Sequence, residues 1–272
     1  MVNGYAPKTL QEALELRAAH DVVPYAGGTD LMVENRRDVT YLFIGKLPEL
    51  RKITADGEYI RIGAAVTVTE ALASDLVPPL MKEAVARIAA PAIRNAGTFG
   101  GNLVNGSAKA DSVLIEFAAG AKLRLVSLKG ERIVDVDKFY LGRKKLDLAK
   151  DELIAEILLP ATGLDRYYYE KVGGRNALAI SRVSFAGIFE EKDGRITNIA
   201  AAFGAVADTV LRYRDLEAIL TGRTIEEARA HRDEFLNAYA ERMTLTRGRV
   251  SAEYRKTVCI NLLNEFLKKF GI

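Results

Sequence analysis

Hydrophobic and polar positions follow two periods along this chain. Residues 9–20 carry apolar side chains at helical spacing, and Thr9 with Glu12 three residues later is typical of a helix start. Alternating segments flank Lys129-Gly130 and Lys192-Asp193-Gly194, as the strands of β-hairpins do. The other patterns predict helices at 66–90, 111–120, 208–220, 224–241 and 251–269, and strands at 40–45, 59–64, 121–128, 131–136, 151–159, 167–172, 182–191 and 195–205.

This mixture of elements predicts an α+β fold in two or three units. The strand pattern of 151–159 ends at Pro160, and a boundary is expected near 161–166. Beyond it the chain has antiparallel strand patterns followed by helical ones.

Residues 93–112 are almost all small, polar or glycine. Both Thr98–Asn105 and Pro24–Leu31 contain a Gly-Gly pair after an apolar segment. Consecutive backbone N–H groups in such turns form concave anion sites, so two loops could hold a diphosphate from both sides. One such loop alone is more often a plain turn. The two together, with the polar run to Asp111, favour a ligand.

Composition excludes several classes of function. The 272-residue chain is 49% hydrophobic, and Lys plus Arg exceed Asp plus Glu by 39 − 36 = 3, too few to imply nucleic-acid binding. A single cysteine, Cys259, forms no internal disulfide and no cysteine-ligated metal site, and it is expected in the core. No signal peptide or membrane-spanning run is present, so a cytoplasmic globular protein is expected. Rossmann, P-loop and serine-hydrolase motifs are also missing.

The segments PYAGGTDL (24–31) and IRNAGTFGGNLVNGSAKADS (93–112) resemble the two flavin-binding segments of a known family. These are the FAD-binding (medium) subunits of molybdenum hydroxylases, which include xanthine dehydrogenase and carbon monoxide dehydrogenase. The likeness extends over essentially the whole chain. It implies a two-piece, PCMH/VAO-like FAD-binding domain over residues 1–163, split near 55–65, and a smaller α+β C-terminal domain over 164–272.

The resemblance also implies roles for individual residues. The diphosphate and adjoining ribityl would be wrapped by Tyr25, Ala26, Gly27, Gly28, Thr29, Asp30 and Leu31. The second side of the cradle would be Thr98, Gly100, Gly101 and Asn102, with Ile88 nearby. Asp111 would hydrogen-bond sugar or ribityl hydroxyls, Ile154 would border the isoalloxazine ring, and Lys171 would approach its polar edge. By pattern alone, Ile154 is an inward strand residue and Lys171 a solvated strand-end charge.

The implied function is that of an oxidoreductase subunit whose FAD carries the chemistry, with no catalytic residue or metal of its own. Thr29 and Asp30 lie where covalent relatives have a histidine, so noncovalent FAD is expected. The implied partners are a molybdopterin-containing large subunit and a [2Fe–2S] small subunit, with NAD⁺ or another electron acceptor, and no membrane. Two alternatives remain: a stand-alone reductase similar to the UDP-N-acetylenolpyruvoylglucosamine reductases, and a non-catalytic flavin-binding scaffold.

Overall fold

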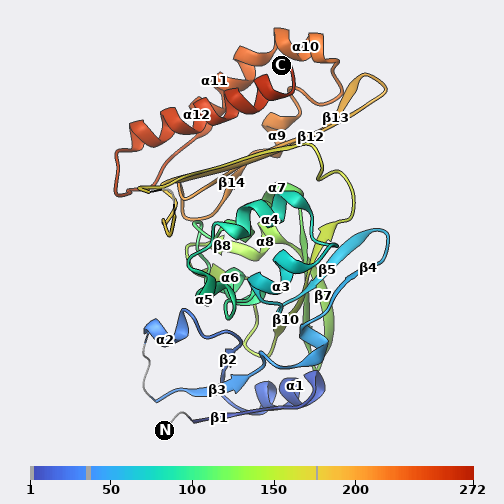
Figure 1. Ribbon diagram of the computed structural model, residues 1–272, viewed down its shortest axis with the longest axis vertical. Coiled ribbons are helices and arrows are strands. Elements are labelled where there is room, and N and C mark those ends of the chain that lie inside the picture. Colours follow the sequence, from blue (N-terminus) through green and yellow to red (C-terminus); the bar gives the residue numbers. More distant parts are fainter. Residues whose placement is uncertain (1–2, 35–37, 176) are drawn as a thin grey trace. The chain divides into compact units, whose positions relative to one another are not determined.

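The computed structural model describes residues 3–34, 38–175 and 177–272 (Figure 1). The chain divides into two units, each built from separate stretches of sequence. The first unit comprises Met1–Val77, Ile88–Gly106 and Gly120–Ala161. The second unit comprises Pro78–Arg87, Ser107–Ala119 and Thr162–Ile272. Two short stretches from the first half of the chain therefore belong to the second unit.

The first unit begins with a three-stranded parallel sheet in the order β1 (Asn3–Tyr5), β3 (Thr40–Phe43), β2 (Val23–Tyr25). Helix α1 (Leu10–Ala19) connects β1 to β2, because parallel strands need a crossover. Thr9 caps this helix through the amide of Glu12, as the sequence predicts. Buried Ala13 and Leu14 share a core with Leu42 of β3.

A five-stranded antiparallel sheet forms the rest of the first unit's framework. Its order is β4 (Ile53–Ala55), β5 (Tyr59–Gly63), β10 (Leu153–Pro160), β6 (Lys122–Ser127), β7 (Gly130–Asp135). The expected β6–β7 hairpin is confirmed, but its turn is Leu128-Lys129, since Gly130 already pairs with Ser127 as the first residue of β7. The unit also holds the hairpin β8 (Tyr140–Gly142) and β9 (Lys145–Leu146), and the short helices α2 (Leu31–Glu34), η1 (Pro48–Leu50), α3 (Val68–Ala73), α5 (Pro91–Arg94), α6 (Phe99–Val104) and α8 (Val136–Phe139).

The second unit is a four-stranded antiparallel sheet covered by helices on both faces (Figure 1). Its strands are β11 (Tyr167–Val172), β12 (Val183–Lys192), β13 (Arg195–Gly204) and β14 (Leu211–Arg212). Helices α4 (Pro79–Ala86) and α7 (Asp111–Ala119) lie on one side, and α9 (Arg214–Glu217), α10 (Ile225–Ala230), α11 (Arg232–Arg242) and α12 (Ala252–Lys269) lie on the other. The β12–β13 hairpin, expected at Lys192-Asp193-Gly194, is confirmed.

Side-chain size differs between the two faces of this sheet. A Cβ at Gly187 would lie 2.5 Å from the Phe266 ring of α12, whereas one at Gly204 would lie 2.4 Å from Ser184 and 3.6 Å from Leu114 of α7. Because alternate strand residues face opposite sides, the residues facing α7 are mostly small. They include Ser184, Ala186, Ala200, Ala202 and Gly204, whereas Phe185, Phe189 and Phe203 share the core of the α12 side.

Two helix predictions in the C-terminal part require correction. The pattern at 208–220 predicts one helix, but the structure has strand β14 and the four-residue α9 there. Leu211 and Arg212 pair with Phe203 and Ala202, so hydrogen bonding to the edge of β13 prevails over helical periodicity. The helix expected at 224–241 is divided at His231 into α10 and α11. The 251–269 prediction is confirmed by α12, in which Cys259 is buried.

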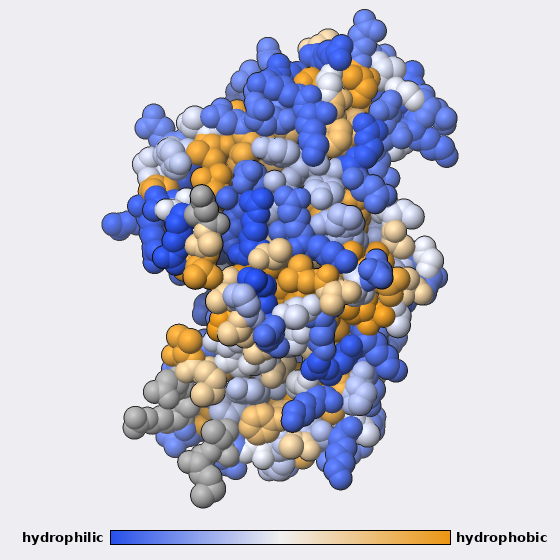
Figure 2. Space-filling model, viewed as in Figure 1, coloured by the Kyte–Doolittle hydropathy of each residue, from blue (hydrophilic) through white to orange (hydrophobic). Residues whose placement is uncertain are grey.

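The surface over α10–α12 is mostly hydrophilic in the view of Figure 2. Among the described residues of these helices, Tyr254 is the exposed large apolar side chain. No helix in the described part of the chain has the length and apolar character needed to cross a bilayer.

One buried carboxyl group in α7 gives the fold a measurable pH dependence. Glu116 is 0% exposed, and burial raises its pKa to about 8, although the Ser112 hydroxyl lowers it somewhat. The folded state therefore holds a proton that the unfolded chain loses near pH 4.5. As pH rises from about 5 to 8, the free energy of unfolding falls because of this group, by roughly 3–5 kcal/mol.

We expect Glu116→Gln to remove this pH dependence. In urea titrations followed by circular dichroism, the stability of the wild type should decline relative to the variant between about pH 5 and 8. Above the folded-state pKa the two curves should run parallel. A stability difference that stays constant across this pH range would show that Glu116 is ionised in the folded protein.

Candidate functional site

The first glycine loop follows β2 and presents a row of backbone donors. Among the described residues, the amides of the five consecutive positions Gly27–Leu31 have no hydrogen-bond acceptor. Gly28 has φ +69°, a left-handed conformation that glycine adopts at little cost. Buried or half-buried amides normally have partners, so this row is suited to an anionic ligand.

The second glycine segment uses its amides within the protein. Thr98 caps α6 by accepting from the Gly101 amide at 3.1 Å, and its carbonyl accepts from Asn102 at 2.9 Å. The Gly100 amide donates to the Ala64 carbonyl at 2.8 Å. A Cβ at Gly100 would lie 2.7 Å from that of Ala64. This segment can therefore contribute side chains and close backbone approach, whereas the amides of Gly100, Gly101 and Asn102 are already occupied.

The two glycine segments lie against each other within the first unit. A Cβ at Gly27 would lie only 1.8 Å from the Ala96 carbonyl oxygen, and one at Gly97 would lie 3.7 Å from Thr29 Oγ1. Glycine at position 27 is thus required by the contact between the loops. The free amides of the first loop stand beside the second, which is an arrangement that fits the diphosphate of FAD. Tyr25 contributes a ring directly beside Gly28.

Within the second unit, Asp111 and Lys171 form a buried ion pair. Lys171 Nζ lies 2.7 Å from Asp111 Oδ2, and the two side chains are 8% and 7% exposed. Ser181 donates to the other oxygen, Oδ1, at 3.4 Å. Burial raises the pKa of Asp111 above its usual range, although the Lys171 ammonium opposes the rise. Lys171 is therefore a buried, paired charge, which the solvated strand-end interpretation did not anticipate.

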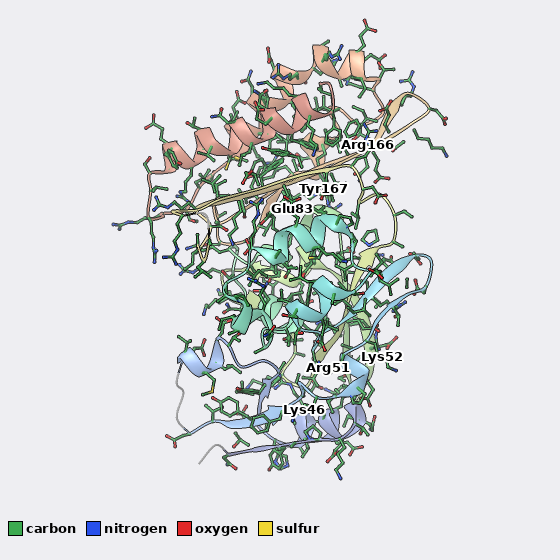
Figure 3. All side chains as sticks on the ribbon, viewed as in Figure 1. Lys46, Arg51, Lys52, Glu83, Arg166 and Tyr167 are labelled. Carbon is green, nitrogen blue, oxygen red and sulfur yellow. The ribbon has the colours of Figure 1, made fainter. Side chains whose placement is uncertain are left out.

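The end of α4 supplies the second partner of Lys171. Its Nζ donates to the Arg87 carbonyl at 3.0 Å, at the C-terminus of α4, where the helix dipole favours a cation. The Arg87 side chain binds Glu170 at 3.2 Å and lies over the Tyr169 ring, and Glu83 lies beside Tyr167 (Figure 3). These contacts hold α4 on β11.

One donor of Lys171 remains for a ligand. An ammonium group carries three N–H donors. Asp111 and the Arg87 carbonyl take two, and the third has no acceptor among the described residues.

The other expected site residues lie in the first unit. Ile88 is half-buried, and its carbonyl accepts from Arg94 at 2.7 Å. Ile154 is 5% exposed in β10 and is paired with Leu125 of β6, as an inward strand residue is. The structure thus gathers the glycine segments in the first unit and joins Asp111 with Lys171 in the second.

Sequence reasoning missed Ser181 and the Arg87 carbonyl. A single serine between apolar residues carries no local signal, and a backbone acceptor carries none at all. Both are recognised only through their contacts with Asp111 and Lys171.

Comparisons with known proteins agree with the resemblance of the glycine segments. A family model described as the FAD binding domain in molybdopterin dehydrogenase matches residues 1–162, and one described as the CO dehydrogenase flavoprotein C-terminal domain matches 167–270. The chain is 32% identical over 220 residues to the xanthine dehydrogenase FAD-binding subunit of Escherichia coli O157:H7, covering 77% of this chain and 75% of that one.

Two further matches come from Hydrogenophaga pseudoflava. Its carbon monoxide dehydrogenase medium chain is 30% identical over 232 residues, covering 80% of this chain and 79% of that one. A solved structure of carbon monoxide dehydrogenase from this organism, lacking the Mo-pyranopterin moiety of the molybdenum cofactor, matches with a TM-score of 0.87. That match has 28% identity and covers 98% of this chain and 96% of that chain, which confirms the α+β fold expected from the resemblance.

Breaking the buried pair should destabilise the protein strongly. We expect Lys171→Met to lower the free energy of unfolding by about 3–5 kcal/mol near neutral pH, because it leaves the Asp111 carboxylate buried without a counter-charge. The double variant Asp111→Asn/Lys171→Met should recover most of this loss. Urea denaturation followed by circular dichroism measures both, since the chain has no tryptophan. Equal stability of Lys171→Met and wild type would contradict the pairing.

Proposed function

This chain belongs to the family of FAD-binding medium subunits of molybdenum hydroxylases, and on that premise we propose that it is the electron-transfer flavoprotein of a larger oxidoreductase complex. FAD, when bound, supplies the redox chemistry. The chain's own residues bind and orient that cofactor. The observation that carries the proposal is the row of five unpartnered amides at Gly27–Leu31 beside the second glycine segment.

The first unit would hold the diphosphate end of FAD. The amides of Gly27–Leu31 would donate to its oxygens, so that neutral dipoles balance the negative charge. Tyr25 and Ala26 precede this row. In the second segment, Thr98, Gly100, Gly101 and Asn102 would close the other side. Gly100, Gly101 and Asn102 would contribute shape and side-chain groups rather than amides, since their amides are used internally.

Other residues would orient the flavin end. Lys171 would direct its remaining N–H toward the polar edge of the isoalloxazine, while Asp111 and the Arg87 carbonyl keep the ammonium in place. Asp111 would also accept from a sugar or ribityl hydroxyl, because each carboxylate oxygen accepts more than one hydrogen bond. Ile88 and Ile154 would provide apolar borders.

The proposed partners are those that the family resemblance implies. Electrons would come from [2Fe–2S] centres on a small partner subunit, which agrees with a chain whose single cysteine cannot ligate an iron–sulfur cluster by itself. A molybdopterin-containing large subunit would oxidise the substrate. Reducing equivalents would leave to NAD⁺ or another acceptor. We further propose that the FAD is noncovalent, that the complex is cytoplasmic, and that residues 1–163 and 164–272 are its FAD-binding and C-terminal domains.

Purification and reconstitution test this function. The protein should carry flavin absorbance or gain it on addition of FAD, and acid precipitation should release the flavin into the supernatant. Flavin retained in the pellet would overturn noncovalent binding. Absence of flavin both before and after FAD addition would overturn the function.

Substitutions in the loops test the placement of the site. Gly27→Ala should raise the Kd for FAD at least about tenfold, roughly 1.4 kcal/mol, because the new Cβ forces the two loops apart. Gly101→Val should also weaken binding, since its Cβ would lie 2.9 Å from the Thr98 hydroxyl that caps α6. Gly57→Ala is the control for general destabilisation, because its φ of +90° strains an alanine there while the new Cβ meets nothing within 4 Å and lies outside both loops. Fluorescence titration with FAD distinguishes them, and wild-type affinity in Gly27→Ala would contradict the placement.

A further inference from the structure

Helix α7 connects the Asp111–Lys171 pair to a second buried ion pair at its other end. Its nine residues run from Asp111 to Ala119, about 13 Å at the helical rise. Residues 111–118 are all buried. On the sheet of the second unit, α7 is bound by the two outermost strands: Lys171 belongs to β11 and Arg212 to β14.

Arg212 caps the C-terminus of α7. Its Nη1 donates to the carbonyls of Phe117 at 2.9 Å and Ala118 at 2.8 Å. The last carbonyls of a helix have no partner within it, and they carry the negative end of the helix dipole. The Arg212 guanidinium group therefore supplies hydrogen-bond donors to these carbonyls and a positive charge at the negative end of the dipole.

Glu217 fixes the guanidinium group of Arg212. Nε and Nη2 of Arg212 each lie 2.9 Å from one oxygen of Glu217, and the two side chains are 8% and 7% exposed. Glu217 Oε1 also accepts from the Ala201 amide of β13 at 3.0 Å. This planar two-bond geometry sets direction as well as distance. The cap is thus rigidly attached to the sheet.

We propose that Arg212, held by Glu217, is a positioning residue for the Asp111–Lys171 pair. A helix transmits axial displacement along its length, so fixing the Phe117–Ala118 end sets the position of Asp111 at the other end. A shift of about 1 Å is enough to break a hydrogen bond of normal length. Through this contact Arg212 tunes how the second unit presents Lys171 to the cofactor, an inference that rests on the proposed FAD function.

The apoprotein provides a test that is independent of FAD. The coupling free energy between Asp111 and Lys171 is measured by a double-mutant cycle with Asp111→Asn and Lys171→Met, using urea denaturation. The cycle is repeated in an Arg212→Lys background, in which the fork is lost but the charge is kept. Coupling should fall by at least half. Unchanged coupling would overturn the proposal.

FAD binding supplies the second test. Arg212→Met/Glu217→Gln removes both charges and leaves neither buried alone. It should raise the Kd for FAD about tenfold and change the visible circular dichroism of bound flavin. In an Asp111→Asn background the same double change should have less than half this effect on log Kd. If the double change has the same effect on log Kd in both backgrounds, Arg212 does not act through Asp111, and the proposal is overturned.

Phe235→Leu is the matched control. Phe235 is 0% exposed in the core on the α12 side of the sheet, so its truncation lowers stability without touching α7. The control should leave the Kd and the flavin spectrum unchanged. If it alters both as much as the Arg212 variant does, the effect of Arg212 is general destabilisation, and the inference is wrong. If the wild type binds no FAD, the proposed function fails, while the apoprotein cycle still decides on Arg212.

Discussion

The obligation to satisfy backbone hydrogen bonds shapes this molecule more than any other constraint. Many helix ends and turns have internal partners, and Arg212 even caps the end of a buried helix. By contrast, the amides of Gly27–Leu31 have no acceptor among the described residues, although four of these five residues are half-buried rather than open to water. A protein that leaves a row of donors unmet is prepared for an acceptor from outside. The second glycine segment shows the contrast, since glycines there serve close packing.

The second unit depends on buried charges that are compensated in pairs. Asp111 with Lys171 and Arg212 with Glu217 lie at opposite ends of α7. Removing one member of such a pair costs more than removing both, because a lone buried charge has no solvent to stabilise it. The pairs therefore contribute specificity of position rather than net stability.

Local patterns in the sequence predicted what local forces determine. The hairpins, α1, α12 and the two glycine segments were found because each depends on neighbours in the chain. The pairing of Asp111 with Lys171, 60 residues apart, arises from sheet and helix packing. The family resemblance indicated both residues, but no local pattern predicted their contact. Arg212 was assigned to a helix because hydrogen bonding at an edge strand leaves no periodic signal.

The makeup of the second unit has a consequence for synthesis on the ribosome. Its α4 and α7 emerge long before residues 162–272, yet they cover the small-residue face of the later sheet. Until β12 and β13 emerge, the apolar flank of α7 that they cover has no native partner. The nascent chain therefore needs shielding by a chaperone, or by non-native contacts that can be exchanged. Conversely, a fragment starting at residue 162 would expose to water the small-residue face of the sheet, which includes Ser184 and Gly204. Such fragments would tend to associate with one another.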